Sequence, residues 1–302
     1  MNLIKGKVIT ILAILFCFCL MLMSCNFGDI IKIKSGGSSA NSNNRNTVSS
    51  KSNYGLGIDE GGKKSHAFRT RNTGSAKMLA GKCLFVNVFI SDAESFFTEN
   101  EKDEVMKQQK EAEDFMKANA QKYGIQLSMI DNTEEMSVDI AAKHTISPNT
   151  SFSIEDIEFF SEVIEDCDKK INFEKYQAEN VFYLFNIDKT GRSYARPNDK
   201  VDGFILNQLE EFAVCYTSDL EDEDELVDTY PGVYVHEILH LFGAIDLYDL
   251  DDERLKLAEK YFPDDIMLTI YRELDLCRID GLTAFLVGWT DELAEKYKTF
   301  LN

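Results

Sequence analysis

The sequence is poor in basic residues relative to acidic ones. Its 302 residues include 32 lysines and arginines against 52 aspartates and glutamates, a formal charge of −20 at pH 7. A chain with this charge is repelled by nucleic acid and by anionic lipid headgroups. We therefore predict that nucleic acid is not a partner, and that attachment to a membrane requires a covalent lipid rather than basic charge.

Several common catalytic motifs are absent. The chain has neither a glycine-rich phosphate loop nor the serine-centred turn of α/β-hydrolases, and it has no internal repeat. Histidine is scarce, with four in the chain and none after His240. A metal site that is completed by a histidine further downstream is thereby excluded.

A long apolar run follows Lys5 and Lys7 near the N-terminus. It covers residues 8–23, which is short for a transmembrane helix and fits the core of a signal peptide. It ends in Leu-Met-Ser-Cys at 22–25, which resembles the lipobox of bacterial lipoproteins, although methionine at the second position is a departure. The resemblance implies cleavage after residue 24, lipidation of Cys25 and a place on the extracytoplasmic side of a bacterial cell membrane. An ordinary signal peptide or an uncleaved anchor is the alternative.

The rest of the chain divides by composition. Residues 25–75 are rich in Ser, Asn, Gly and Lys, which predicts a disordered tether. Residues 76–302 are long and apolar enough for one folded domain with its own core. Disulfides and buried free thiols are equally compatible with the cysteines of that domain, which are Cys83, Cys167, Cys215 and Cys277.

Helical and strand patterns alternate along residues 76–302, which predicts an α/β domain with a twisted, mostly parallel sheet. Gly124 is expected to end a long polar helix that begins at Glu99. Ser153 opens an amphipathic helix, and a C-terminal helix is predicted over 282–300. The predicted strands are 83–90, 125–130, 181–187, 204–206 and 212–217.

The motif that can carry chemistry is HExxH at His236-Glu237-Ile238-Leu239-His240. Pro231 suits the first turn of a helix that runs to about Phe242. On such a helix His236 and His240 stand one above the other and can bind one Zn²⁺. Glu237 can take a proton from a metal-bound water. The apolar opposite side of the helix, with Val235, Leu239 and Phe242, is predicted to pack into the core.

Residues 236–246 read HEILHLFGAID, and residues 264–268 read DDIML. The first stretch resembles the HExxHxxGxxH/D motif of metzincin-like zinc peptidases, in the aspartate form of snapalysin and the immune inhibitor A family. The second is similar to their Met-turn. The resemblance implies a zincin (metzincin-like) catalytic domain with an active-site helix. It also implies one catalytic zinc held by His236, His240 and Asp246, with Glu237 as general base and Met267 beneath the metal.

This ligand set requires a turn in the chain. Ten residues of continuous helix would carry Asp246 about 15 Å along the axis from His236, out of reach of a shared metal. The chain must therefore leave the helix soon after His240, and Gly243 is the residue best able to fold it back. Two alternatives for the third ligand stay open. One is a nearby aspartate, Asp249 or Asp251, and the other is a downstream glutamate from the set Glu253, Glu259 and Glu273.

The implied function is that of a membrane-anchored zinc endopeptidase that hydrolyses peptide bonds in protein or peptide substrates. Tyr248 and Tyr271 are candidates for stabilising the transition state, because the family position for a tyrosine ligand holds Thr269 here. A strand at 212–217 could bind substrate by strand addition. The alternative is an inactive zincin-fold surface lipoprotein that binds a protein or peptide ligand. The acidic run 219–225 is either a solvated loop or a structural Ca²⁺ site.

Overall fold

The computed structural model describes residues 76, 78–133, 136–148, 154–197, 211–222 and 225–301. Contacts divide the chain into units 1–49 and 50–302, and every described residue belongs to the second. The predicted signal peptide, the lipidation site Cys25, the tether 25–75 and the strand 204–206 lie outside the described residues. In the part of the chain that the structure describes, no helix is both long and apolar enough to cross a bilayer.

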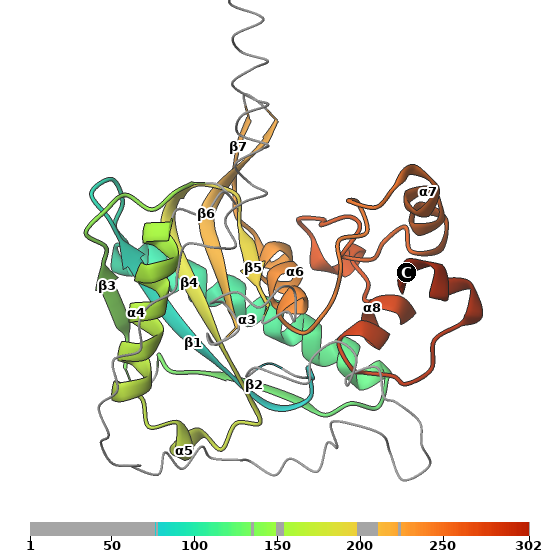
Figure 1. The fold of residues 1–302 in the computed structure, drawn as a ribbon, viewed down its shortest axis with the longest axis horizontal. Coiled ribbons are helices and arrows are strands. Elements are labelled where there is room, and N and C mark those ends of the chain that lie inside the picture. Colours follow the sequence, from blue (N-terminus) through green and yellow to red (C-terminus); the bar gives the residue numbers. More distant parts are fainter. Residues whose placement is uncertain are drawn as a thin grey trace, which may run out of the picture. The chain divides into compact units, whose positions relative to one another are not determined.

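A mostly parallel sheet forms the frame of the fold, in the order β2-β1-β4-β6-β5 (Figure 1). Neighbouring strands among β2, β1, β4 and β6 run parallel. Strand β3 also runs parallel to β1 and pairs with its residues 88–91, after the segment 81–85 that pairs with β2. Strands β5 and β7 both run antiparallel to β6. The predicted α/β class with a mostly parallel sheet is therefore confirmed. The strands are β1 (Gly81–Ser91), β2 (Leu127–Asp131), β3 (Val138–Ala141), β4 (Asn180–Thr190), β5 (Tyr194–Arg196), β6 (Phe212–Asp222) and β7 (Glu225–Asp228).

Both faces of the sheet are buried. Phe85 of β1 belongs to one core cluster, which it shares with α3 (Glu99–Lys122) and α6 (Pro231–Leu241). The next residue, Val86, belongs to the opposite cluster, with α4 (Ile154–Lys170). Alternation of this kind fits the pleat of a strand that is covered on both sides, so the central strands read as continuous apolar runs.

Glycine ends the long helix α3 as predicted. Gly124 has φ 73°, and the main-chain N–H of Ile125 donates back to the carbonyl of Ala120 at 3.1 Å. The N-terminus of the helix is closed by a capping box between Thr98 and Glu101. Because both ends are fixed locally, sequence alone placed this helix correctly.

The predicted C-terminal helix over 282–300 is wrong. Helix α8 (Gly281–Leu286) ends after two turns, because Gly288 adopts φ 97° and Trp289 donates its main-chain N–H to Ala284 O at 2.8 Å. The Trp289 indole then donates to Leu79 O at 2.6 Å. Of the apolar residues that suggested one helical face, Leu282, Phe285, Leu286 and Trp289 are buried, whereas Leu293 and Tyr297 are only partly buried. The next helical element, η4 (Glu295–Leu301), is separate from α8. Helix α7 (Asp252–Tyr261) and η3 (Leu274–Leu276) were not predicted.

Two further expectations are decided by the strand order. The strand at 212–217 is the core of β6, which pairs with β4 on one side and with β5 and β7 on the other. It is therefore an interior strand, and the expectation that its edge is open to substrate is wrong. The short strand β5 lies at that side of the sheet instead. The four cysteines of the domain are buried free thiols, Cys83, Cys167, Cys215 and Cys277.

Candidate metal centre

Helix α6 holds the HExxH residues against the sheet. It begins at Pro231 and ends at Leu241, with Phe242 as its C-cap. Val235, Leu239 and Phe242 are fully buried, which confirms the predicted core-facing side. The helix packs on α3, β5 and β6, so its histidine side is fixed relative to the edge of the sheet.

The chain turns back directly after the helix. Gly243 has φ 108°, and Ala244 N–H donates to Leu239 O at 3.1 Å while Gly243 N–H donates to His240 O at 3.0 Å. This pair of bonds is the Schellman arrangement, which needs a left-handed residue at the position of Gly243. The predicted exit from the helix at this glycine is confirmed, and it carries residues 244–246 back along the histidine side.

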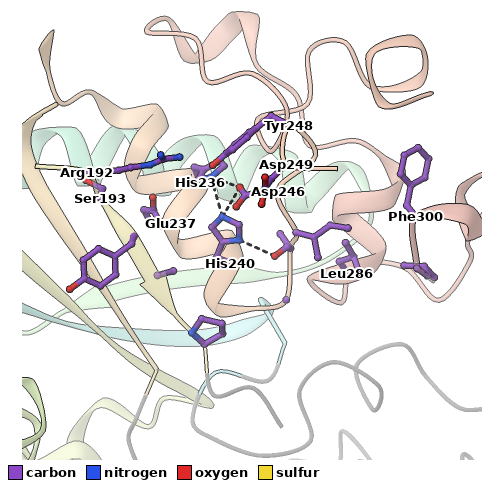
Figure 2. A pocket seen from close by; sticks show the side chains of 17 residues that line it. Arg192, Ser193, His236, Glu237, His240, Asp246, Tyr248, Asp249, Leu286 and Phe300 are labelled. Atoms are coloured by element: carbon purple, nitrogen blue, oxygen red, sulfur yellow. Dashed lines mark hydrogen bonds and ion pairs between the residues drawn. The ribbon is translucent and has the colours of Figure 1, made fainter. Parts of the chain in front are cut away.

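Three side-chain atoms converge where the returning chain meets the helix (Figure 2). His240 Nε2 lies 3.0 Å from His236 Nε2 and 3.0 Å from Asp246 Oδ1. His236 Nε2 lies 3.1 Å from the same Asp246 oxygen. Among the described residues, these three form the only group of histidine, cysteine or carboxylate side chains with the spacing of a metal site.

Hydrogen bonds assign the tautomer of both imidazoles. His236 Nδ1 lies 3.1 Å from Ile266 O, and His240 Nδ1 lies 3.0 Å from Ala244 O. A carbonyl oxygen only accepts, so each Nδ1 carries the hydrogen and each neutral ring directs an Nε2 lone pair at the centre of the group. Two lone pairs and a carboxylate oxygen thus face one another, and a divalent cation would satisfy all three.

The spacing of the three atoms fits a tetrahedral ion. Ligands at about 2.0–2.1 Å from Zn²⁺ in tetrahedral geometry lie about 3.3 Å from one another. The observed separations of 3.0 and 3.1 Å are slightly shorter. None of the alternative ligands belongs to this group. Asp251 caps α7 by accepting from Arg254 N at 3.0 Å, and four more are exposed. These four are Asp249, Glu253, Glu259 and Glu273.

The charges of the group depend on one another. Burial alone would raise the pKa of Asp246, but the two histidines beside it hold that pKa well below its usual range. Burial opposes the charged form of His240, whereas Asp246 and Glu237 favour it, and the net pKa of His240 is raised. Burial raises the pKa of Glu237, and the two histidines act in the opposite direction. Glu237 is 6% exposed and stands outside the converging group.

The buried Asp265 fixes the turn against which His236 is oriented. Asp265 accepts hydrogen bonds from Met267 N at 2.9 Å, Asp280 N at 2.8 Å and the Thr283 hydroxyl at 3.0 Å. It thereby holds the turn that contains Ile266 O, the acceptor for His236. Burial raises the pKa of Asp265 to about 6. Met267 is fully buried in the same turn, next to the residue that orients His236.

Two cavities meet at the converging group. The larger, about 860 Å³, runs along β5 and is bordered by the C-terminal residues Phe300 and Leu301. The smaller, about 190 Å³, lies toward β6 and β7. Tyr248 lines both cavities, and its ring stacks on His236 with centroids 6.0 Å apart. Tyr271, the other predicted tyrosine, lines neither.

Sequence reasoning missed Arg192, which also lines both cavities (Figure 2). It lies between β4 and β5, in no recognised motif. The preceding Gly191 is the one local signal, because an added Cβ would lie 2.6 Å from the Tyr216 ring. That glycine marks a close approach of the chain at the end of a strand.

The Ca²⁺ site in the acidic run stays a prediction, because the structure does not describe the side chains of residues 220–227. Asp219 and Asp228, at either end of that stretch, line the smaller cavity.

Comparison of the chain with known proteins finds no family model that matches it and no curated protein that matches it significantly.

Proposed function

We propose that the chain is a zinc-dependent endopeptidase with a zincin (metzincin-like) fold, which hydrolyses peptide bonds in protein or peptide substrates. The observation that carries the proposal is the convergence of His236 Nε2, His240 Nε2 and Asp246 Oδ1 within 3.1 Å of one another. They meet at the wall of a cavity that is large enough for a peptide, with Glu237 beside them.

Each residue has a definite task in this mechanism. His236, His240 and Asp246 would hold the ion, leaving a fourth position open, and bound zinc would polarise the scissile carbonyl and acidify a water. Glu237 takes the proton of the attacking water and delivers it to the leaving amine. Its position next to His236 but outside the ligand group suits that shuttle, because a metal-bound carboxylate could not move the proton as freely.

Strand β5 is the element that we assign to substrate binding. It is the last strand at its side of the described sheet, and Tyr194 and Ala195 line the larger cavity. An extended peptide that adds to this edge would run past the converging group, with its main chain held by the strand.

The test of the proposal is Glu237→Gln. The variant should bind about one zinc per chain, as the parent does, and lose peptidase activity by on the order of 10²-fold or more. Glu253→Gln, an exposed glutamate of α7, is the matched control and should keep full activity. Metal analysis and a peptide-library assay give the two readouts. If the parent binds zinc and cleaves no peptide, the inactive ligand-binding lipoprotein becomes the better account.

We further propose that a lipid on Cys25 anchors the protein at the outer face of a bacterial membrane. The lipobox-like ending of the N-terminal apolar run supports this. Cys25→Ser should move the protein from the membrane fraction to the soluble fraction and abolish labelling by a fatty-acid analogue. Labelling that persists in the variant would contradict the anchor.

A further inference from the structure

Arg192 is distinguished by its charge at this site. Among the described residues that line the two cavities, it is the only lysine or arginine. The other charged side chains there are carboxylates, and the chain as a whole carries −20. Arg192 is thus a single cation at the junction of two cavities whose other charged residues are acidic.

The main chain fixes the position of Arg192. Gly191 N–H donates to Ser218 O at 2.9 Å, and Arg192 N–H donates to Pro148 O at 3.0 Å. Tyr216 N–H donates to the Ser193 hydroxyl at 3.1 Å. Three consecutive residues are thus tied to neighbouring segments, so the base of the arginine side chain is held although the residue itself is exposed.

Arg192 and Tyr248 reach one another across the group. In Figure 2 the Arg192 guanidinium and the Tyr248 phenol approach each other beside His236. Burial and the charge of Asp246 raise the pKa of this phenol, and Arg192 acts in the opposite direction. The Tyr248 ring lies nearly parallel to the His236 ring, at 18°. The arginine fork therefore presents hydrogen-bond donors to the space beside Glu237 and the converging group, and the phenol lies at the same place.

We propose that Arg192, together with Tyr248, binds the oxygen of the scissile carbonyl and stabilises the negative charge that this oxygen acquires. The inference rests on the proposed peptidase function and assigns a catalytic residue to it. Water oxygen bonds to the carbonyl carbon, and the carbonyl π pair moves to the oxygen that Arg192 and Tyr248 hold. Glu237 takes the water proton. The pair then returns, the C–N bond breaks, and the amine nitrogen receives the proton from Glu237.

Charge and geometry both favour this role over a structural one. A donor that is held in position and aimed at developing negative charge stabilises the transition state more than the ground state. The planar guanidinium can donate to Tyr248 and to an oxyanion at once, which an ammonium cannot do with the same geometry. Arg272 offers a contrast, since it is also exposed but lies over the Tyr230 ring at 5.3 Å and lines neither cavity.

The experiment compares Arg192→Gln, Arg192→Lys and the control Arg272→Gln in the zinc-loaded full chain. Arg192→Gln should keep its zinc and lower kcat on the order of 10²-fold with little change in KM. Arg192→Lys should fall between the parent and the glutamine variant, and Arg272→Gln should match the parent. Peptides with glutamate or glutamine beside the scissile bond are measured in parallel.

A binding readout separates this inference from the peptidase proposal. A phosphinic peptide, which mimics the tetrahedral oxyanion, should bind Arg192→Gln on the order of 10²-fold more weakly than the parent. Acetohydroxamate, which needs only the metal, should bind both equally. Equal binding of the phosphinic peptide would overturn the role of Arg192 even in an active parent. If Arg192→Gln lowers kcat only for the peptide with glutamate, the oxyanion role would also be overturned, because Arg192 would then bind a substrate side chain.

Discussion

The imidazole Nδ1 of His240 donates to the main-chain oxygen of Ala244 at 3.0 Å. The helix thus ends in a turn that orients its own last histidine, because the residue after Gly243 supplies the acceptor. The same turn begins the segment that brings Asp246 to the group, so one backbone conformation serves two of the three proposed ligands.

Gly243→Val should weaken zinc binding although it leaves every proposed ligand in place. The φ of 108° at this position is strained for any residue with a side chain, at a cost of about 1–3 kcal/mol. Displacing Ala244 also removes the acceptor for His240, and loss of such an outer contact weakens metal binding about 10–100-fold. Chelator competition measures the affinity. Gly124→Val, at another left-handed helix end, is the control, and equal zinc affinity in both variants would contradict the role of the turn.

Asp246→Ala should lose zinc binding far more strongly than Asp249→Ala. Asp246 Oδ1 lies 3.0 and 3.1 Å from the two histidine nitrogens, whereas Asp249 lines the cavity without joining the group. Removing one of three ligands also leaves the other two facing an incomplete site. Isothermal titration with zinc provides the comparison. An Asp246→Ala protein that binds zinc as tightly as the parent would mean that the third ligand lies elsewhere.

Asp265→Asn should lower both stability and zinc affinity. Its carboxylate accepts three hydrogen bonds, and an amide group there would set an N–H against at least one donor, which costs about 1–3 kcal/mol. Zinc affinity should fall about tenfold, because the turn orients His236 through Ile266 O. Thermal unfolding and chelator competition test the two effects. The control Asp264→Asn, at the neighbouring exposed residue, should show neither effect. If Asp265→Asn changes neither stability nor zinc affinity, Asp265 does not support the turn that orients His236.

Stability should depend on Asp92 in acid. Burial opposes its charge, but Lys189 at 2.6 Å and hydrogen bonds from residues 94, 95 and 146 lower its pKa from 3.8 to about 2. A depressed pKa means that the carboxylate stabilises the fold above about pH 4, and that this contribution is lost as the pH falls toward 2. The shift corresponds to about 2 kcal/mol.

Urea unfolding of the parent and of Asp92→Asn measures this contribution. The difference in the free energy of unfolding should be about 2 kcal/mol at pH 7 and should shrink between pH 4 and pH 2. Asp103→Asn, an exposed aspartate of α3, is the control and should follow the parent throughout. A difference that stays constant across this range would show that the ion pair with Lys189 does not control it.

The sequence alone determined those features that depend on nearby residues. The i, i+4 spacing of His236 and His240 places them on one helix face at any orientation of that helix. Gly124 and Gly243 ended their helices as expected, because a left-handed residue closes a helix through bonds within its own last turn. The buried central strands could also be predicted from the sequence, since strands of a sheet that is covered on both faces are continuous apolar runs.

Only the tertiary structure decided features that depend on distant pairing. The short strand β5 and the interior place of β6 follow from strand order, which no local pattern encodes. The end of the C-terminal helix at Gly288 is joined to an indole bond with Leu79, more than 200 residues earlier. Arg192 lines both cavities at the converging group because separate strands and loops fix its backbone. Hydrogen bonds and packing between segments far apart in the chain set these positions. Local sequence could therefore indicate the proposed ligands but not the residues that surround them.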